Sequence, residues 1–174
     1  AIRFPICRKD QFSKWTDTPG VHKGFDYGRS HNPTRFSFER CVTDLEDGTA
    51  GFAFASGLAA IATVLELLEH GSHVVVCDDL YGGSFRLFER VRRRSANLDF
   101  TYVDPTDLTA FEAAVRPNTR MIWIETPSNP LLKLADLEEL AGLARRHKLI
   151  SVADNTFATP YVQLYNSGLL GIAL

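Results

Sequence analysis

The sequence has little of what marks metal centres, disulfide-bonded domains or membrane spans. Its 174 residues contain three cysteines, too few and too widely spaced for a metal cluster or a disulfide framework, which favours a reducing compartment. The five histidines are scattered without an H-E-x-x-H or paired-ligand spacing, so we predict no metal site. No long run of apolar residues occurs, so we expect neither a membrane-spanning helix nor a membrane partner.

Charge and composition bear on further classes of protein. A net charge of −2 gives no general attraction to nucleic acid. The basic run at 90–94 has no interleaved aromatic residues, so we interpret it as the solvated outer face of a helix. The first residues contain no apolar core of signal-peptide length, and we expect a cytoplasmic protein. With 45% hydrophobic and 23% charged residues, the chain is typical of one globular domain.

An alternation of apolar segments predicts the fold. Residues 1–20 have no clean period and are expected to form an irregular arm, followed by an ordered loop over 21–36 and a short helix from Phe36 to about Glu46. Strands are predicted at 52–56, 73–78, 98–103, 120–125 and 149–154, and helices at 57–71, 81–96, 107–115 and 135–148. This alternation with short connections predicts an α/β fold with a mostly parallel sheet and helices on both faces.

Two of these helices carry more specific signals. In 81–96, the residues Phe85, Phe88 and Val91 recur at helical spacing and are expected to face the core. In 135–148, Asp136 precedes the apolar stripe and Glu139 follows three residues later, which predicts a capping box at the start of that helix.

Polar residues follow four of the predicted strands at the point where each strand ends. They occupy positions 56–57, 78–81, 125–129 and 154–156. Because ligands of open α/β sheets bind beyond the carboxyl ends of the strands, we expect all four clusters to face one site. Neither a G-x-G-x-x-G motif nor a Walker loop occurs, which disfavours dinucleotides and nucleoside triphosphates.

Each cluster has a purely structural alternative. Ser56 and Gly57 could cradle a phosphate at a helix start or form a simple helix cap. Tyr81 could stack on a flat ring or pack as an ordinary aromatic residue. Asn129, in a loop fixed by prolines, could donate to a ligand oxygen or serve the turn. Asp154, at the end of an apolar strand, could pair with a cationic ring nitrogen or form an Asx turn or a helix cap.

Five segments together resemble one enzyme family. The segments YGRSHNPTR (27–35), FASGLAA (54–60), DDLYGGSFRLF (78–88), ETPSNPLL (125–132) and VADNTFATPY (152–161) are similar, in order, to the Cys/Met-metabolism enzymes that depend on pyridoxal phosphate. That family includes cystathionine γ-synthase, cystathionine γ-lyase, cystathionine β-lyase and methionine γ-lyase. The resemblance implies the large domain of a fold type I pyridoxal-phosphate enzyme, present in part, over 21–163, with a divergent tail over 164–174.

The resemblance implies pyridoxal 5'-phosphate as the cofactor and assigns contacts to it. The matching positions are Tyr27, Arg29, Ser56, Gly57, Leu58, Tyr81, Asn129, Asp154 and Thr156. Residues 56–58 match the phosphate cradle, and Tyr81 matches a catalytic tyrosine that stacks on the ring and can assist proton movement. Asp154 matches the aspartate that keeps the pyridine nitrogen protonated. Asn129 falls near the ring hydroxyl, and Thr156 matches a cofactor-contacting threonine.

The resemblance also implies partners and a substrate. Tyr27 and Arg29 match a pair that reaches the phosphate of a neighbouring subunit, which implies a homo-oligomer, usually a tetramer. The implied substrate is an amino acid with a sulfur or ester leaving group at its γ carbon, such as cystathionine. The segment YGGSF (81–85) resembles the γ-synthase and γ-lyase branch, whereas methionine γ-lyases carry a cysteine at the position of Gly83.

The chain departs from the family at the lysine that holds the cofactor covalently. The family carries this lysine in an S-x-T-K-Y segment, and no lysine of this sequence lies in such a segment; the lysines are Lys9, Lys14, Lys23, Lys133 and Lys148. We therefore expect the chain alone to be inactive and, with an exposed sheet edge, prone to aggregate. The alternatives are a non-catalytic relative that binds the cofactor or a partner subunit, and a different fold type I enzyme such as an aminotransferase, against which YGGSF and ETPSNP speak.

Overall fold

The computed structural model describes residues 29, 31–46, 48–158 and 170–172. The chain forms two units, Ala1–Ala53 (unit 1) and Phe54–Leu174 (unit 2). The domain boundaries that the sequence predicts, near residues 20 and 163, lie outside the described residues and stay predictions.

Helix α2 (Pro33–Leu45) is the helix of unit 1 in the described residues, and it begins earlier than the predicted Phe36. The side-chain oxygen of Asn32 accepts the N–H groups of Thr34 at 2.9 Å and Arg35 at 3.1 Å. Pro33 occupies the first helical position, where its missing N–H costs nothing. The capping asparagine and the proline therefore belong to the helix start and not to the loop predicted over 21–36.

The strand predicted at 52–56 is wrong, because these residues form no strand. Phe52 is 78% exposed and Phe54 is 45% exposed. An alternating apolar segment becomes a strand only where a neighbouring strand satisfies its N–H and C=O groups. Here the Ala53 N–H donates instead to Oε1 of Glu39 at 2.9 Å.

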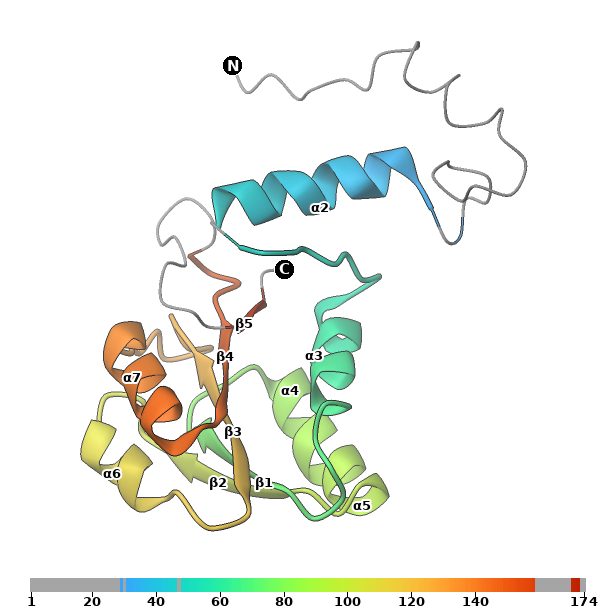
Figure 1. Cartoon of the computed structure of the whole chain (residues 1–174). Helices are drawn as coiled ribbons and strands as arrows, with labels where there is room; N and C mark the ends of the chain where they lie inside the picture. The colour runs from blue at the N-terminus through green and yellow to red at the C-terminus, as the bar shows by residue number, and fades with distance from the viewer. Residues whose placement is uncertain (1–28, 30, 47, 159–169, 173–174) are drawn as a thin grey trace. The chain divides into compact units, whose positions relative to one another are not determined.

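Unit 2 contains a five-stranded sheet in the order β2-β1-β3-β4-β5, in which every pairing is parallel (Figure 1). The strands are β1 (His73–Cys77), β2 (Asp99–Val103), β3 (Thr119–Glu125), β4 (Ile150–Asp154) and β5 (Leu170–Ile172). The predicted parallel sheet is confirmed. Strand β5 lies in the tail for which the sequence predicted no element, and it pairs with the end of β4, from Val152 to Asp154.

Helices cover both faces of this sheet, as predicted. Figure 1 shows α3, α4 and α5 on one face and α6 and α7 on the other. None of the helices in the described part of the chain is long and apolar enough to cross a membrane. The helices of unit 2 are α3 (Gly57–Leu65), α4 (Gly82–Arg86), the π-helical η1 (Leu87–Arg92), α5 (Arg93–Ser95), α6 (Leu108–Ala113) and α7 (Leu137–His147).

The π-helical turn corrects the predicted buried face of residues 81–96. Phe88 is fully buried, but Phe85 is 44% exposed and Val91 is 47% exposed. In an α-helix, residues three apart lie on nearly the same face, whereas the wider π-helical turn rotates them apart. Only the middle residue of the predicted stripe therefore reaches the core.

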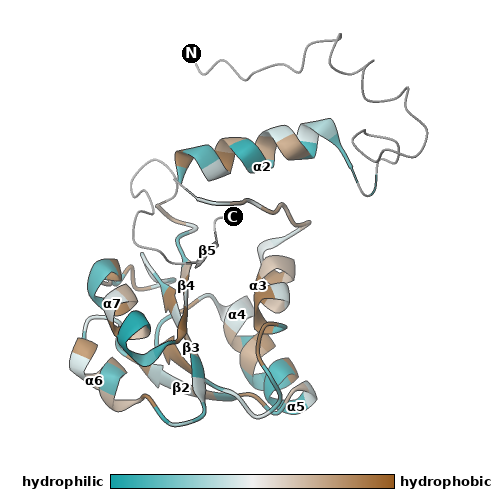
Figure 2. Ribbon diagram, viewed as in Figure 1, coloured by the Kyte–Doolittle hydropathy of each residue, from teal (hydrophilic) through white to brown (hydrophobic). Residues whose placement is uncertain are grey.

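The core lies around the two central strands β1 and β3, which are buried on both faces. Residues 74–77 of β1 and 121–124 of β3 have no exposed surface, as expected for parallel strands between two helix layers. The ring of Phe88 stacks on Phe100 at 5.1 Å and meets Trp123 edge-on at 5.3 Å. Figure 2 shows apolar strands enclosed by helices whose outer turns are hydrophilic.

Of the two hydrogen bonds in the capping box predicted for the helix at 135–148, one is present. The Asp136 side chain accepts the Glu139 N–H at 3.0 Å, which is one of the two bonds of a capping box. Helix α7 ends at His147, and the next residue, Lys148, has a φ of 56° in the left-handed region, a common way to terminate a helix.

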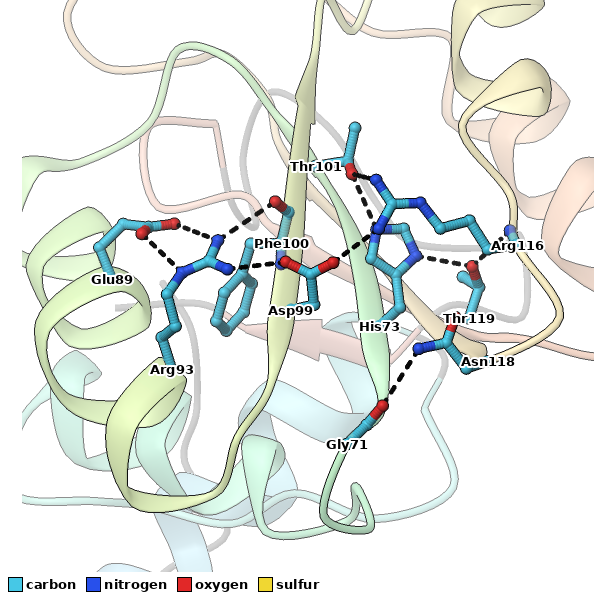
Figure 3. A network of polar contacts seen from close by, with 10 residues as sticks. All are labelled: Gly71, His73, Glu89, Arg93, Asp99, Phe100, Thr101, Arg116, Asn118 and Thr119. Carbon is cyan, nitrogen blue, oxygen red and sulfur yellow. Dashed lines mark hydrogen bonds and ion pairs between the residues drawn. The ribbon is translucent and has the colours of Figure 1, made fainter.

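A network of polar side chains joins the starts of strands β1, β2 and β3 (Figure 3). His73 lies between the hydroxyls of Thr119, at 2.7 Å, and Thr101, at 2.9 Å. Arg93 and Arg116 both pair with Asp99, at 2.7 and 2.6 Å. The basic run at 90–94 is thus only partly a solvated surface, because Arg93 bonds its helix to strand β2.

Candidate active site at the carboxyl edge of the sheet

The order of the strands fixes where a ligand can lie. The chain leaves β1 through α4 to reach β2, and it leaves β3 through α7 to reach β4, in the opposite direction along the sheet. These helices lie on opposite faces (Figure 1). The neighbouring strands β1 and β3 are therefore the topological switch point, beyond whose carboxyl ends open α/β sheets bind their ligands.

Asp154 is the last residue of β4 and is 3% exposed. Its Oδ1 accepts the Thr156 hydroxyl and, at 3.2 Å, the Thr156 N–H, so the predicted Asx turn is present. Burial raises the pKa of Asp154, against the opposing effect of these two bonds. Within the described residues Asp154 forms no ion pair, so a cation is the partner that this carboxylate lacks.

Glu125 ends strand β3 and is also 3% exposed. Its two oxygens accept the Tyr81 N–H at 3.1 and 2.9 Å, and Oε1 accepts the Asn129 N–H at 2.9 Å. Burial raises the pKa of Glu125 to about 7; the charges of Asp154 and Asp79 add to this and the N–H donors oppose it. Glu125 falls in the polar cluster predicted at 125–129, but the sequence assigned it no role.

Tyr81 and Asn129 follow the ends of β1 and β3, and Glu125 brings their backbones together. The Tyr81 ring is 44% exposed, so a face remains for a ligand. The ring lies against Gly83, where an added Cβ would be 2.3 Å from Cε1 of Tyr81. Asn129 is half-buried. The structure therefore brings together three of the four polar clusters that the sequence predicts at this edge.

Helix α3 carries the fourth cluster, residues 56–58. The Ser56 hydroxyl accepts the Ala59 N–H at 3.2 Å, so the predicted helix cap is present. Gly57 is buried and Leu58 is 38% exposed. Helix α3 contacts β5, which pairs with the end of β4. That residues 56–58 cradle a phosphate of the ligand contacted by Asp154 stays a prediction.

Two remaining predicted residues belong to unit 1. Tyr27 lies outside the described residues. Arg29 is described, and its backbone carbonyl accepts a bond from Nη1 of Arg35 at 3.5 Å. Their contact with a neighbouring subunit stays a prediction.

Sequence reasoning missed a second set of bonds between the loops at this edge. Oδ2 of the buried Asp79 accepts the Ser128 hydroxyl at 2.5 Å and the Leu131 N–H at 2.9 Å. Nζ of Lys133 pairs with Asp78 at 2.9 Å and with Asp104 at 2.8 Å. The signal was present, because three of these residues, Asp78, Asp79 and Ser128, fall within the segments 78–81 and 125–129.

A pocket of about 200 Å³ lies elsewhere, on the side of α6 and α7. Its lining includes Pro105, Leu108 and Leu134, and it contains none of the predicted site residues.

Comparison with known proteins decides the family. The sequence profile described as "Cys/Met metabolism PLP-dependent enzyme" matches residues 4–166. The chain belongs to this family.

Within the Cys/Met-metabolism family, several relatives are close in sequence and structure. The chain is 56% identical over 163 residues to a cystathionine beta-lyase of Coxiella burnetii and 48% identical over 163 residues to a cystathionine gamma-lyase of Bacillus subtilis. These alignments cover 94% of the chain and 42% of each relative, so the chain spans less than half the length of either. A crystal structure of cystathionine gamma-lyase from Lactobacillus plantarum, complexed with L-serine, superposes with a TM-score of 0.79 at 48% identity; the match covers 83% of this chain and 38% of that one.

The family cofactor is pyridoxal 5'-phosphate, and the described residues fit it. The cofactor carries a ring nitrogen that can be protonated, and Asp154 is a buried carboxylate without an ion-pair partner among the described residues. The half-exposed Tyr81 ring offers a stacking face on the same edge of the sheet. The match to the PLP-dependent fold type I large domain is therefore consistent with both the strand order and the chemistry of this edge.

Proposed function

We propose that this chain is part of a carbon–sulfur lyase or γ-replacement enzyme that acts on cystathionine or a related γ-substituted amino acid. The relatives named above, which are a cystathionine beta-lyase and two cystathionine gamma-lyases, support this substrate class. Asp154 carries the proposal, since it is a buried carboxylate beside the switch point with no cationic partner among the described residues, and a protonated pyridine ring would supply that cation. When bound, pyridoxal phosphate supplies an electron sink for charge at the amino-acid α carbon.

Each of the site residues would contact a different part of the cofactor. Asp154 keeps the ring nitrogen protonated, and Thr156 orients the Asp154 carboxylate through its two bonds. Tyr81 stacks on the ring and can move a proton near it. Asn129 donates to the ring hydroxyl. The start of helix α3, residues 56–58, binds the phosphate through free N–H groups and the helix dipole.

Two contributions come from elsewhere in the assembled enzyme. Tyr27 and Arg29 reach the phosphate in a neighbouring subunit, so the enzyme is a homo-oligomer. The covalent lysine is not among the described lysines at this edge, because Lys133 is engaged by Asp78 and Asp104 and Lys148 follows helix α7 before β4 begins. These 174 residues alone would then bind the cofactor without turning over substrate.

The branch of the family is a finer proposal. The segment YGGSF favours the γ-lyase or γ-synthase branch, while the relatives include both β- and γ-lyases. The protein expressed from the full reading frame would convert cystathionine and water to cysteine, 2-oxobutanoate and ammonia if it is a γ-lyase. Homocysteine and pyruvate as products would instead assign it to the β-lyases.

Binding of a cofactor analogue tests the site directly. The analogue 4'-deoxypyridoxine 5'-phosphate keeps the ring and phosphate but has no aldehyde to react with surface lysines. We expect saturable binding to the chain by calorimetry, weakened about tenfold in Asp154→Asn through loss of the charged contact. Asp107→Asn is the matched control, because Asp107 caps helix α6 and asparagine caps equally well. Absence of binding in the folded chain, or equal affinity in Asp154→Asn, would contradict the proposal.

A further inference from the structure

Glu125 ties together two loops that leave the sheet in opposite directions. Its carboxylate accepts the N–H of Tyr81, from the loop after β1, and the N–H of Asn129, from the loop after β3. Both bonds to Tyr81 and the bond to Asn129 lie between 2.9 and 3.1 Å. A single side chain thus sets the separation of two backbones at the switch point.

The surroundings of Glu125 are not those of a structural ion pair. Within the described residues Glu125 has no cationic partner, and the charges that raise its pKa are those of Asp154 and Asp79, both negative. Its own N–H donates to Sγ of Cys77 at 3.3 Å, so the residue is also fixed from strand β1. Burying a carboxylate among carboxylates is costly, so a stabilising role does not account for it.

The position of the Tyr81 side chain is fixed by two contacts, one through its backbone and one through its ring. Its backbone N–H is fixed by Glu125, and its ring lies so close to Gly83 that an added Cβ there would be 2.3 Å from the ring. A shift of the Glu125 carboxylate would therefore move the ring itself. The Asn129 backbone is fixed by the same carboxylate, so the two side chains would move relative to each other.

We propose that Glu125 is a positioning residue that sets the spacing between the Tyr81 ring and the Asn129 side chain, and with it the space for the cofactor ring. This inference rests on the proposed function, because Tyr81 and Asn129 are the residues assigned to that ring. Glu125 acts through their backbones and makes no contact with the cofactor itself. Asp79 ties the same loops through Ser128 and Leu131, which have no assigned cofactor contact.

Two substitutions separate position from charge. Glu125→Gln keeps the shape but places an NH₂ group, a donor, against the Tyr81 N–H. Glu125→Asp keeps the charge but is one methylene shorter, so it cannot reach both N–H groups. Glu138→Gln is the control, because Glu138 is exposed in the first turn of α7.

Three measurements are made on the 174-residue chain, with 4'-deoxypyridoxine 5'-phosphate as the probe. They are the dissociation constant, the induced circular dichroism of the bound ring, and amide hydrogen exchange at Tyr81 and Asn129 without probe. We expect both Glu125 variants to bind about tenfold more weakly, to change the induced signal, and to exchange faster at those two amides. Both variants should remain folded in urea-free buffer, and Glu138→Gln should match the wild type throughout.

The outcomes separate this inference from the proposed function. If the wild type binds the probe and the Glu125 variants match its affinity and induced signal, the inference is overturned and the proposed function stands. If the folded wild type does not bind, the proposed function fails, and the role of Glu125 at a cofactor fails with it. If Glu125→Asp matches the wild type in affinity and induced signal while Glu125→Gln does not, the negative charge of Glu125 matters and not its position. That outcome is contrary to the inference. Unfolding of both variants would make Glu125 a fold-wide determinant, which also overturns it.

Discussion

Asp154 and Glu125 are each 3% exposed, and burial raises the pKa of both. A carboxyl group whose pKa is raised on folding stabilises the fold fully only below its unfolded pKa, and that contribution is lost as the pH rises through the folded pKa. At neutral pH and above, the ionised groups therefore lower the stability of the chain. Residues that cost stability in this way are typical of sites selected for binding or catalysis.

Asp154→Asn should consequently have opposite effects on stability and on binding. Its free energy of unfolding should exceed that of the wild type by about 1 kcal/mol at pH 8, because the buried charge is gone. The difference should shrink as the pH falls toward the unfolded pKa of an aspartate, because the wild-type carboxyl becomes protonated over that range. Urea unfolding across that pH range measures this effect, with Asp107→Asn as the control. A variant less stable than the wild type at pH 8 would refute the argument.

Gly83→Ala should weaken ligand binding without unfolding the chain. The added Cβ would lie 2.3 Å from Cε1 of Tyr81, so the ring must move away from its place at the site. The ring is 44% exposed, so its displacement costs little packing, and alanine is the better helix former in α4. We expect an unfolding free energy within about 1 kcal/mol of the wild type and several-fold weaker binding of 4'-deoxypyridoxine 5'-phosphate.

Gly82→Ala is the matched control in the same helix turn. Its Cβ would approach only the flexible end of Arg86, at 3.4 Å, and not the Tyr81 ring. Equal binding by the two alanine variants would show that the ring position does not matter for the ligand.

At the scale of elements, the sequence predicts well those segments whose burial alone decides their structure. Strands β1 and β3 are apolar throughout and buried on both faces, so composition and period identify them. The predictions fail for elements whose structure depends on whether a neighbouring strand is available for pairing. Residues 52–56 have the strand pattern but pair with no strand in the part of the chain that the structure describes. Strand β5 lacks such a pattern and forms because it pairs with the outer side of β4.

The location of the candidate site was predictable because it follows from the predicted strands. Its residues stand directly after strands, and parallel strands bring their carboxyl ends to one edge, so the clusters of Asp154, Tyr81 and Asn129 could be grouped from sequence. The bonds between the loops could not. Glu125 can accept the Tyr81 N–H only because β1 and β3 are neighbours in the sheet. Along the chain these two strands are separated by α4, β2 and α6, so the sequence does not reveal the contact.

At the other ends of the strands, the network of Figure 3 contains a buried histidine, from which we expect a pH-dependent stability. His73 is fully buried, and burial, helped by the charges of Arg116 and Arg93 and opposed by Asp99, lowers its pKa. A histidine whose pKa is lowered on folding stabilises the fold above its unfolded pKa, and the contribution is lost as the pH falls through the folded value. Acidification should thus weaken the starts of strands β1, β2 and β3 together.

His73→Gln tests this element. Between pH 7 and pH 5, the wild type should lose about 1 kcal/mol of unfolding free energy relative to the variant, because the unfolded wild type binds a proton at His73 that the buried side chain resists. His70→Gln, at an exposed position, should track the wild type. Thermal or urea unfolding across this range supplies the measurement. Parallel pH profiles for wild type and His73→Gln would exclude His73 as the sensitive group.

At the scale of the whole molecule, the chain spans 42% of the length of each of the two relatives named above. Arg29 lies in unit 1, whereas Asp154 ends a strand of unit 2. If Arg29 serves the phosphate of a neighbouring subunit, each site combines Asp154 of one copy with Arg29 of another. A closed symmetric oligomer makes that exchange reciprocal.

Mixing two defective variants tests the shared site. Arg29→Ala and Asp154→Asn should each bind 4'-deoxypyridoxine 5'-phosphate weakly. In a hybrid dimer, one site would pair the intact Asp154 of the first variant with the intact Arg29 of the second, and the other site would lose both. After unfolding and refolding an equal mixture, about one quarter of all sites should recover wild-type affinity, since half of the dimers are hybrids with one intact site each. Calorimetric stoichiometry measures the fraction. If Arg29 acted within its own chain, no hybrid could hold an intact site, and the mixture would bind no better than its components.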